Sequence, residues 1–151
     1  MSARAFFPGT GDDDWVSHRN WLADEGGYSL DTDCIILPMQ SYVLRTSHHT
    51  ILVDTCIGNH KERPSHPEWH RNTSSRYLDN LKLLGLRCDD IDIVMCTHLH
   101  VDQVGWNTKL VDGRWVPTFP NAKYLLSKKE LDAFRSEAPD ATSGPLVDSV
   151  L

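Results

Sequence analysis

The sequence predicts an α/β fold in which a mixed β-sheet is flanked by helices. Short apolar runs typical of buried strands alternate with segments whose apolar residues recur at helical spacing. Hydrophobic residues make up 40% of the 151 residues, which is enough to form a core. No glycine-rich phosphate-binding loop follows any of these runs, so the pattern excludes a dinucleotide-binding unit.

The first strands are expected after an N-terminal arm. Residues 1–31 show no strong period, so we expect the domain itself to cover residues 32–151. It begins with a short apolar run at 34–37. Two further apolar runs, 41–46 and 50–54, flank a short polar stretch, which indicates a β-hairpin.

A loop, a helix and a buried strand are expected next. Residues 58–73 hold two prolines, three histidines and several charges without periodicity, which is typical of a functional loop at the rim of a site. The apolar positions after Ser74 recur at helical spacing; Thr73 or Ser74 can cap this helix, and Gly85 can end it. Residues 91–96 then read as a buried strand.

The C-terminal part adds another strand and another helix. A tryptophan-bearing turn at 112–115 precedes an apolar run at 122–126, which predicts a strand. Ser127 and Glu130 fit a capping box that opens a helix, and Pro139 would end it. The apolar residues of the inner face of this helix are Leu131, Phe134 and Ala138.

The charge balance limits the partners. The chain has 15 Lys+Arg and 21 Asp+Glu, and its net charge of -6 argues against nucleic acid or an anionic membrane surface as the main partner. No stretch approaches the ~20 apolar residues of a membrane span, and the N-terminus is unlike a signal peptide. We therefore expect a cytoplasmic protein. Its four cysteines lack CxxC spacing, which favours free thiols.

The most informative segment is the polar stretch 97–107, directly after the predicted strand 91–96. His98 and His100 are two residues apart, so on an extended backbone both imidazoles project to the same side. Two converging imidazoles suit zinc and similar metals. Asp102 follows within reach, and its carboxylate can bind a second ion or orient an attacking water.

At these residues the sequence resembles the metallo-β-lactamase superfamily. The signature of that family is HxHxDH after a strand, preceded by a strand that ends in an Asp-Thr-like dipeptide. This chain carries the dipeptide as Asp54-Thr55 and the signature as residues 98–102. Over roughly residues 37–134 the sequence is similar to the lactonase-like and organophosphate-hydrolase-like branch. The resemblance implies that residues 32–151 form a partial domain, the N-terminal half of an αβ/βα sandwich.

The resemblance also implies a role for each motif residue. His98 and His100 would bind a first metal ion. Asp102 would bind the second ion and handle protons as the catalytic carboxylate, and Asp54 would brace the metal-bearing loop. The cofactor would be one or two zinc ions, with manganese or iron as alternatives. A metal-bound water would then cleave an ester, lactone or related bond.

The chain departs from the family pattern at two points. Gln103 stands where the family has His, and an amide oxygen is a poorer zinc donor than imidazole, so Gln103 is a weak candidate ligand. The family's later ligands come from the second half of its fold. We interpret the chain as the N-terminal portion of a longer hydrolase or as a truncated member. The alternative is a non-catalytic member that holds at most one ion weakly. The weak ligand Gln103 and the lack of a flavin-binding sequence disfavour a di-iron redox protein.

An N-terminal half of the fold, taken alone, would leave one face of the predicted sheet uncovered. Without a second sheet, one face of the strands would be open to solvent, which makes an isolated fold prone to association and leaves a homodimer open. The residues on this face are Ile51, Val53, Ile93 and Met95.

Overall fold

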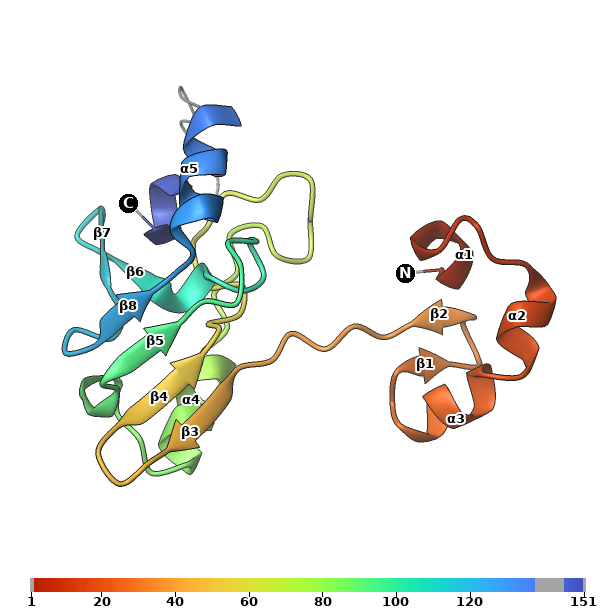
Figure 1. Cartoon of the computed structure of the whole chain (residues 1–151), viewed down its shortest axis with the longest axis horizontal. Helices are drawn as coiled ribbons and strands as arrows, with labels where there is room; N and C mark the ends of the chain where they lie inside the picture. The colour runs from red at the N-terminus through yellow and green to blue at the C-terminus, as the bar shows by residue number, and fades with distance from the viewer. Residues whose placement is uncertain (1, 138–145, 151) are drawn as a thin grey trace. The chain divides into compact units, whose positions relative to one another are not determined.

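The structure is a computed structural model that describes residues 2–137 and 146–150. The chain divides into two compact units, Met1–Pro38 and Met39–Leu151. Figure 1 colours both along the chain. The second unit contains the motif of interest, and its mixed sheet with flanking helices confirms the predicted fold class.

The first unit consists, over residues 2–38, of short helices and a small antiparallel hairpin. Its elements are α1 (Ala3–Phe6), α2 (Asp12–Val16), α3 (Arg19–Asp24), β1 (Tyr28–Ser29) and β2 (Cys34–Ile35). Trp15 stacks on Tyr28 with 6.1 Å between ring centroids, and its indole N–H donates to the Thr10 hydroxyl at 2.9 Å. The strand predicted at 34–37 is shorter than expected. Its partner β1 has only two residues, and Pro38 has no N–H to donate.

The second unit is built on a four-stranded sheet in the order β3-β4-β5-β8 (Figure 1). Its strands are β3 (Tyr42–Arg45), β4 (Thr50–Val53), β5 (Ile93–Met95) and β8 (Lys123–Leu125). β3 and β4 form the predicted antiparallel hairpin, whereas β5 and β8 extend the sheet in parallel. Parallel neighbours need a long crossover connection, and α4 (Arg76–Leu83) lies in the connection between β4 and β5.

The sequence prediction missed two strands. β6 (Thr108–Val111) and β7 (Arg114–Pro117) form an antiparallel hairpin. Its turn consists of Asp112 and Gly113, both with positive φ, at 48° and 77°. Asp-Gly is a strong signal for such a turn. Trp115, which we had placed in the turn, lies on β7 opposite Leu110.

The helix α4 begins slightly later than predicted. Its N-cap is Ser75 rather than Thr73 or Ser74, although the Ser74 hydroxyl accepts a hydrogen bond from the Arg76 N–H at 3.3 Å. Gly85 follows the helix with φ 71°, the left-handed conformation that the prediction required.

The helix α5 (Lys128–Glu137) has only half of the predicted capping box. The Ser127 hydroxyl accepts from the Glu130 N–H at 3.4 Å, but the Glu130 carboxylate bonds elsewhere, as described below. Leu131 and Phe134 pack against the core as predicted. Ala138 and Pro139 lie outside the described residues.

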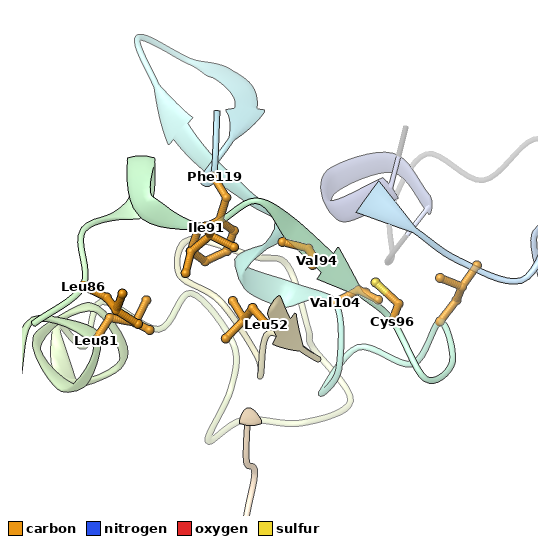
Figure 2. Packing of buried hydrophobic residues seen from close by; sticks show 9 residues of the cluster. Leu52, Leu81, Leu86, Ile91, Val94, Cys96, Val104 and Phe119 are labelled. Carbon is orange, nitrogen blue, oxygen red and sulfur yellow. The ribbon is translucent and has the colours of Figure 1, made fainter. Parts of the chain in front are cut away.

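The core lies on one face of the sheet. Leu52 of β4 and Val94 of β5 are register neighbours and fully buried, and α4 contributes Leu81 to the same cluster. Figure 2 shows these side chains with other members of the cluster. The remaining buried members are Leu86, Ile91, Cys96, Leu99, Val104 and Phe119. Leu99 belongs to the histidine motif, so the motif is anchored directly in the core.

The opposite face of the sheet is apolar and partly open. Tyr42, Val53, Met95 and Leu125 are aligned across the four strands. Within this unit Met95 is 39% exposed and Leu125 is 48% exposed, whereas Ile51 and Ile93 are half-buried. This is the open face that the sequence predicted. Association of two copies through it stays a prediction.

Two further expectations concern membranes and cysteines. In the described residues no helix is long and apolar enough to cross a membrane. All four cysteines are free, as expected, and Cys96 is buried in the core.

Candidate metal-binding site

The histidine motif follows the C-terminal end of β5. The rings of His98 and His100 lie edge to face, with 4.6 Å between their centroids. Leu99 between them is fully buried, whereas His98 is half-buried and His100 is exposed. Burial of Leu99 in the core therefore leaves the two imidazoles together at the surface of the domain.

Asp54 connects the end of β4 to this motif. It is buried and has a positive φ of 58°. Its carboxylate accepts hydrogen bonds from the Thr97 N–H at 2.8 Å and from the Thr97 hydroxyl at 2.7 Å. The Thr97 oxygen in turn lies 3.1 Å from Nδ1 of His98. Asp54 thus ties the end of β4 to the start of the motif. Thr97 is the link that the sequence analysis did not single out.

Glu130 holds the same motif from the other direction. Its carboxylate Oε1 accepts a hydrogen bond from the Leu99 N–H at 2.8 Å. The sequence analysis had assigned this side chain to the capping box of α5. The two residues are 31 positions apart, so no local spacing pattern indicates the contact.

The segments after β4 and after the motif lie against each other. The Thr55 N–H donates to the Gln103 carbonyl at 2.6 Å, and the Trp106 N–H donates back to the Thr55 carbonyl at 2.9 Å. A Cβ on Gly105 would stand 1.9 Å from the carbonyl carbon of Ile57. Only glycine permits this approach, so the two segments fix each other's position.

Asp102 and Gln103 interact with each other. The Gln103 side-chain amide donates to Asp102 Oδ2 at 3.0 Å. Among the described residues, no group of three or more His, Cys, Asp or Glu side chains comes together to hold a metal ion. The structure thus places the His98 and His100 rings in contact and does not bring Asp102 into one group with them. A zinc ion with the usual three protein ligands does not fit the described part of this chain.

The loop 58–73 folds around two buried cations, which the sequence analysis missed. The Arg63 guanidinium binds both carboxylate oxygens of Asp148, at 2.7 and 2.9 Å. The Lys61 ammonium is fully buried, donates to the Thr108 hydroxyl at 2.6 Å and to the Asp148 carbonyl, and lies 3.7 Å from the centroid of the Trp115 ring. Burial lowers the pKa of Lys61 to about 7, although the Asp148 carboxylate opposes this shift.

Comparison with known proteins identifies the family. The profile of the metallo-beta-lactamase superfamily matches residues 37–149, well over half of the chain. The chain belongs to the metallo-β-lactamase superfamily. No curated protein matches the sequence.

Two of the solved structures to which the chain is similar share its fold, with TM-scores above 0.5. A probable metal-dependent hydrolase from Staphylococcus aureus is 22% identical, with a TM-score of 0.67 over 90% of this chain and 46% of its own. The hydrolase AbOPH is 23% identical, with a TM-score of 0.52 over 76% of this chain and 34% of its own. AidC, a dizinc quorum-quenching lactonase, is 25% identical over 61% of this chain and 27% of its own, with a TM-score of 0.48. This chain spans less than half of the length of each.

Proposed function

We propose that the protein is a metal-dependent hydrolase to which this chain contributes His98 and His100 as metal ligands. The observation that carries the proposal is the 4.6 Å separation of the two imidazole rings at the end of β5. Membership of the superfamily supports it, as does the hydrogen-bonded link from Asp54 through Thr97 to His98. Asp102 is the proposed catalytic carboxylate and second-metal ligand.

The proposed substrate is a small molecule with an ester, lactone or related bond, and the proposed cofactor is zinc, with manganese or iron as alternatives. The described residues bring two imidazoles together and no third ligand. Three protein ligands are the usual minimum at a catalytic zinc site. We therefore expect the chain to bind a single Zn²⁺ ion weakly and to need further ligands for turnover.

Calorimetric titration with Zn²⁺ tests the ligand assignment. We expect His98→Ala and His100→Ala each to weaken Zn²⁺ binding by at least tenfold, because loss of either imidazole leaves one ligand. His48, exposed in the β3–β4 turn, offers a matched control, and His48→Ala should bind Zn²⁺ like the unaltered chain. Equal Zn²⁺ affinity of all four proteins would contradict the proposal.

A second candidate is a non-catalytic member of the superfamily that holds one ion weakly. The observation that favours it is the hydrogen bond of 3.0 Å from the Gln103 amide to one carboxylate oxygen of Asp102. Gln103→His removes this amide and adds an imidazole. The matched control is Gln40→His, at an exposed position outside the motif.

Hydrolysis of p-nitrophenyl butyrate and γ-butyrolactone with added Zn²⁺ separates the two candidates. If the protein is a hydrolase limited by Gln103, turnover should rise at least tenfold in Gln103→His and stay unchanged in Gln40→His. If Zn²⁺ binding tightens in Gln103→His and turnover stays at the uncatalysed rate, Gln103 is not what limits turnover, and the residues of this chain do not by themselves form a catalytic site.

A further inference from the structure

A pocket lies between β3 and α4, apart from the histidine motif. Its volume is about 510 Å³, within the size range of small-molecule sites. None of His98, His100 and Asp102 lines it. Ligand binding in this pocket can therefore be tested separately from metal binding at the histidine motif.

Two hydrogen bonds join the chain around β3 to α4 and its C-terminus. At one end the Ser41 hydroxyl donates to the Tyr77 hydroxyl at 3.3 Å. At the other end the Arg45 guanidinium donates to the Leu84 carbonyl at 2.6 Å. The stretch of α4 and its C-terminus that lines the pocket spans residues 76–84, or about 12 Å at ~1.5 Å per residue.

The two ends of the pocket differ in chemistry. The lining beside Leu84 is mostly apolar, with Val43 and Leu52 from the sheet and Leu81 and Leu84 from the helix side; Asn80 is its polar member, and Arg45 does not line the pocket. At the other end Ser41, Asn72 and Arg76 supply polar groups. Trp106 stacks on Tyr77 there, with 5.5 Å between the centroids and 9° between the ring planes.

Arg76 brings a positive charge to the polar end. Its side chain is exposed and forms no ion pair with any residue of the described ranges. The nearby carboxylate of Asp79 is paired with Lys82 at 3.0 Å instead. The cation at the mouth of the pocket is therefore available to an anionic ligand.

We propose that this pocket binds a linear aliphatic carboxylate of medium chain length. The carboxylate pairs with the Arg76 guanidinium, and the alkyl chain lies along Val43, Leu81 and Leu84. Charge complementarity at one end and apolar walls at the other match this ligand. The proposal is independent of the metal chemistry proposed above.

Titration of the chain with decanoate, below its micelle concentration and without added metal, tests the proposal. Binding is followed through fluorescence, because Trp106 lines the pocket, and Trp106→Phe identifies its contribution. In the series hexanoate, octanoate and decanoate, we expect affinity to rise about fourfold for each added CH₂, as for burial of a methylene group.

Two variants test the placement of the alkyl chain. Leu84→Trp should fill the apolar end and weaken decanoate binding at least tenfold. Leu83→Trp is the matched control, since Leu83 is 85% exposed and does not line the pocket, and its affinity should be unchanged. Leu44→Ser alters the open sheet face, an apolar surface that does not line the pocket, and should also leave decanoate affinity unchanged.

The head group is tested by comparing decanoate with 1-decanol. Arg76→Ala should weaken decanoate binding about three- to fivefold, the worth of an exposed ion pair, and leave decanol unaffected. Lys129→Ala, an exposed cation on α5, is the control. Equal losses for both ligands in Arg76→Ala would overturn the anionic assignment. Binding that survives Leu84→Trp and disappears in Leu44→Ser would place the ligand on the sheet face and overturn the site.

Discussion

The carboxylate of Glu130 on α5 accepts a hydrogen bond at 2.8 Å from the backbone N–H of Leu99, the residue between the two histidines. The helix α5 comes after β8 in the sequence, and the histidine motif comes before β8. A residue of this helix thus holds the motif. The bond gives the backbone N–H of Leu99 a carboxylate acceptor, and the Leu99 side chain is fully buried. The position of both imidazoles therefore depends on a residue far from them in the chain.

Glu130→Ala should lower the free energy of unfolding by about 1–3 kcal/mol, because it leaves a partly buried N–H without its charged acceptor. Urea unfolding measures the loss, and hydrogen exchange should show faster exchange of the Leu99 amide. Glu137→Ala, at an exposed position on the same helix, is the control and should change neither quantity. Unchanged exchange at Leu99 would mean that the bond does not hold the motif.

Gly105→Ala should destabilise the second unit by more than about 4 kcal/mol, since the added Cβ would lie 1.9 Å from the backbone of Ile57. Backbone atoms cannot move aside as a flexible side chain can. Gly85→Ala separates this clash from ordinary backbone strain. Gly85 has φ 71° but open space around it, so its cost should be about 1–2 kcal/mol. Thermal unfolding compares the two, and equal losses would contradict the steric argument.

Local patterns explain which parts of this fold the sequence could predict. The β3–β4 hairpin, β5 and the end of α4 at Gly85 follow from apolar runs, turn residues and a left-handed glycine, all within a few positions. β6 and β7 were missed because polar and charged residues interrupt both strands, and we interpreted their Asp-Gly turn without assigning strands to its two sides. The pairing of β6 with β7 was found only from the structure, which gives the register of the hairpin.

The candidate site shows the same division between local and distant contacts. The pairing of His98 and His100 follows from a spacing of two residues. The sequence could not show that Asp102 belongs to no three-residue group among the described residues, or that the Gln103 amide donates to one of its carboxylate oxygens. Lys61 and Asp148 are 87 residues apart, and no periodicity connects residues at such a distance.

Asp148→Ala should lower the free energy of unfolding by about 3–5 kcal/mol, because it leaves the buried guanidinium of Arg63 and the ammonium of Lys61 without their carboxylate. Asp132→Ala is the control. Asp132 pairs with Lys128 at the surface, where an ion pair contributes about 0–1 kcal/mol. Urea unfolding at neutral pH measures both variants, and similar small losses would show that Asp148 does not hold the buried cations.

Lys61 should make stability depend on pH. Burial lowers its pKa from 10.5 to about 7, so between these values the unfolded chain binds more protons at this residue than the folded chain. The free energy of unfolding that Lys61 contributes therefore rises with pH across this window. Burial raises the pKa of Cys96, and of Tyr124 to about 12, and these groups act in the opposite direction at alkaline pH.

Lys61→Met removes the titrating amine and keeps an unbranched side chain, so comparing it with the unaltered chain isolates the contribution of Lys61. The difference in unfolding free energy, unaltered chain minus variant, should rise by about 1 kcal/mol per pH unit from pH 7.5 to 9.5, just below the limit of ~1.4 for one proton. Urea unfolding across this range measures it. Lys129→Met, at an exposed position, should give a difference that does not change with pH. Parallel curves for Lys61→Met would mean that Lys61 keeps its proton in the folded protein.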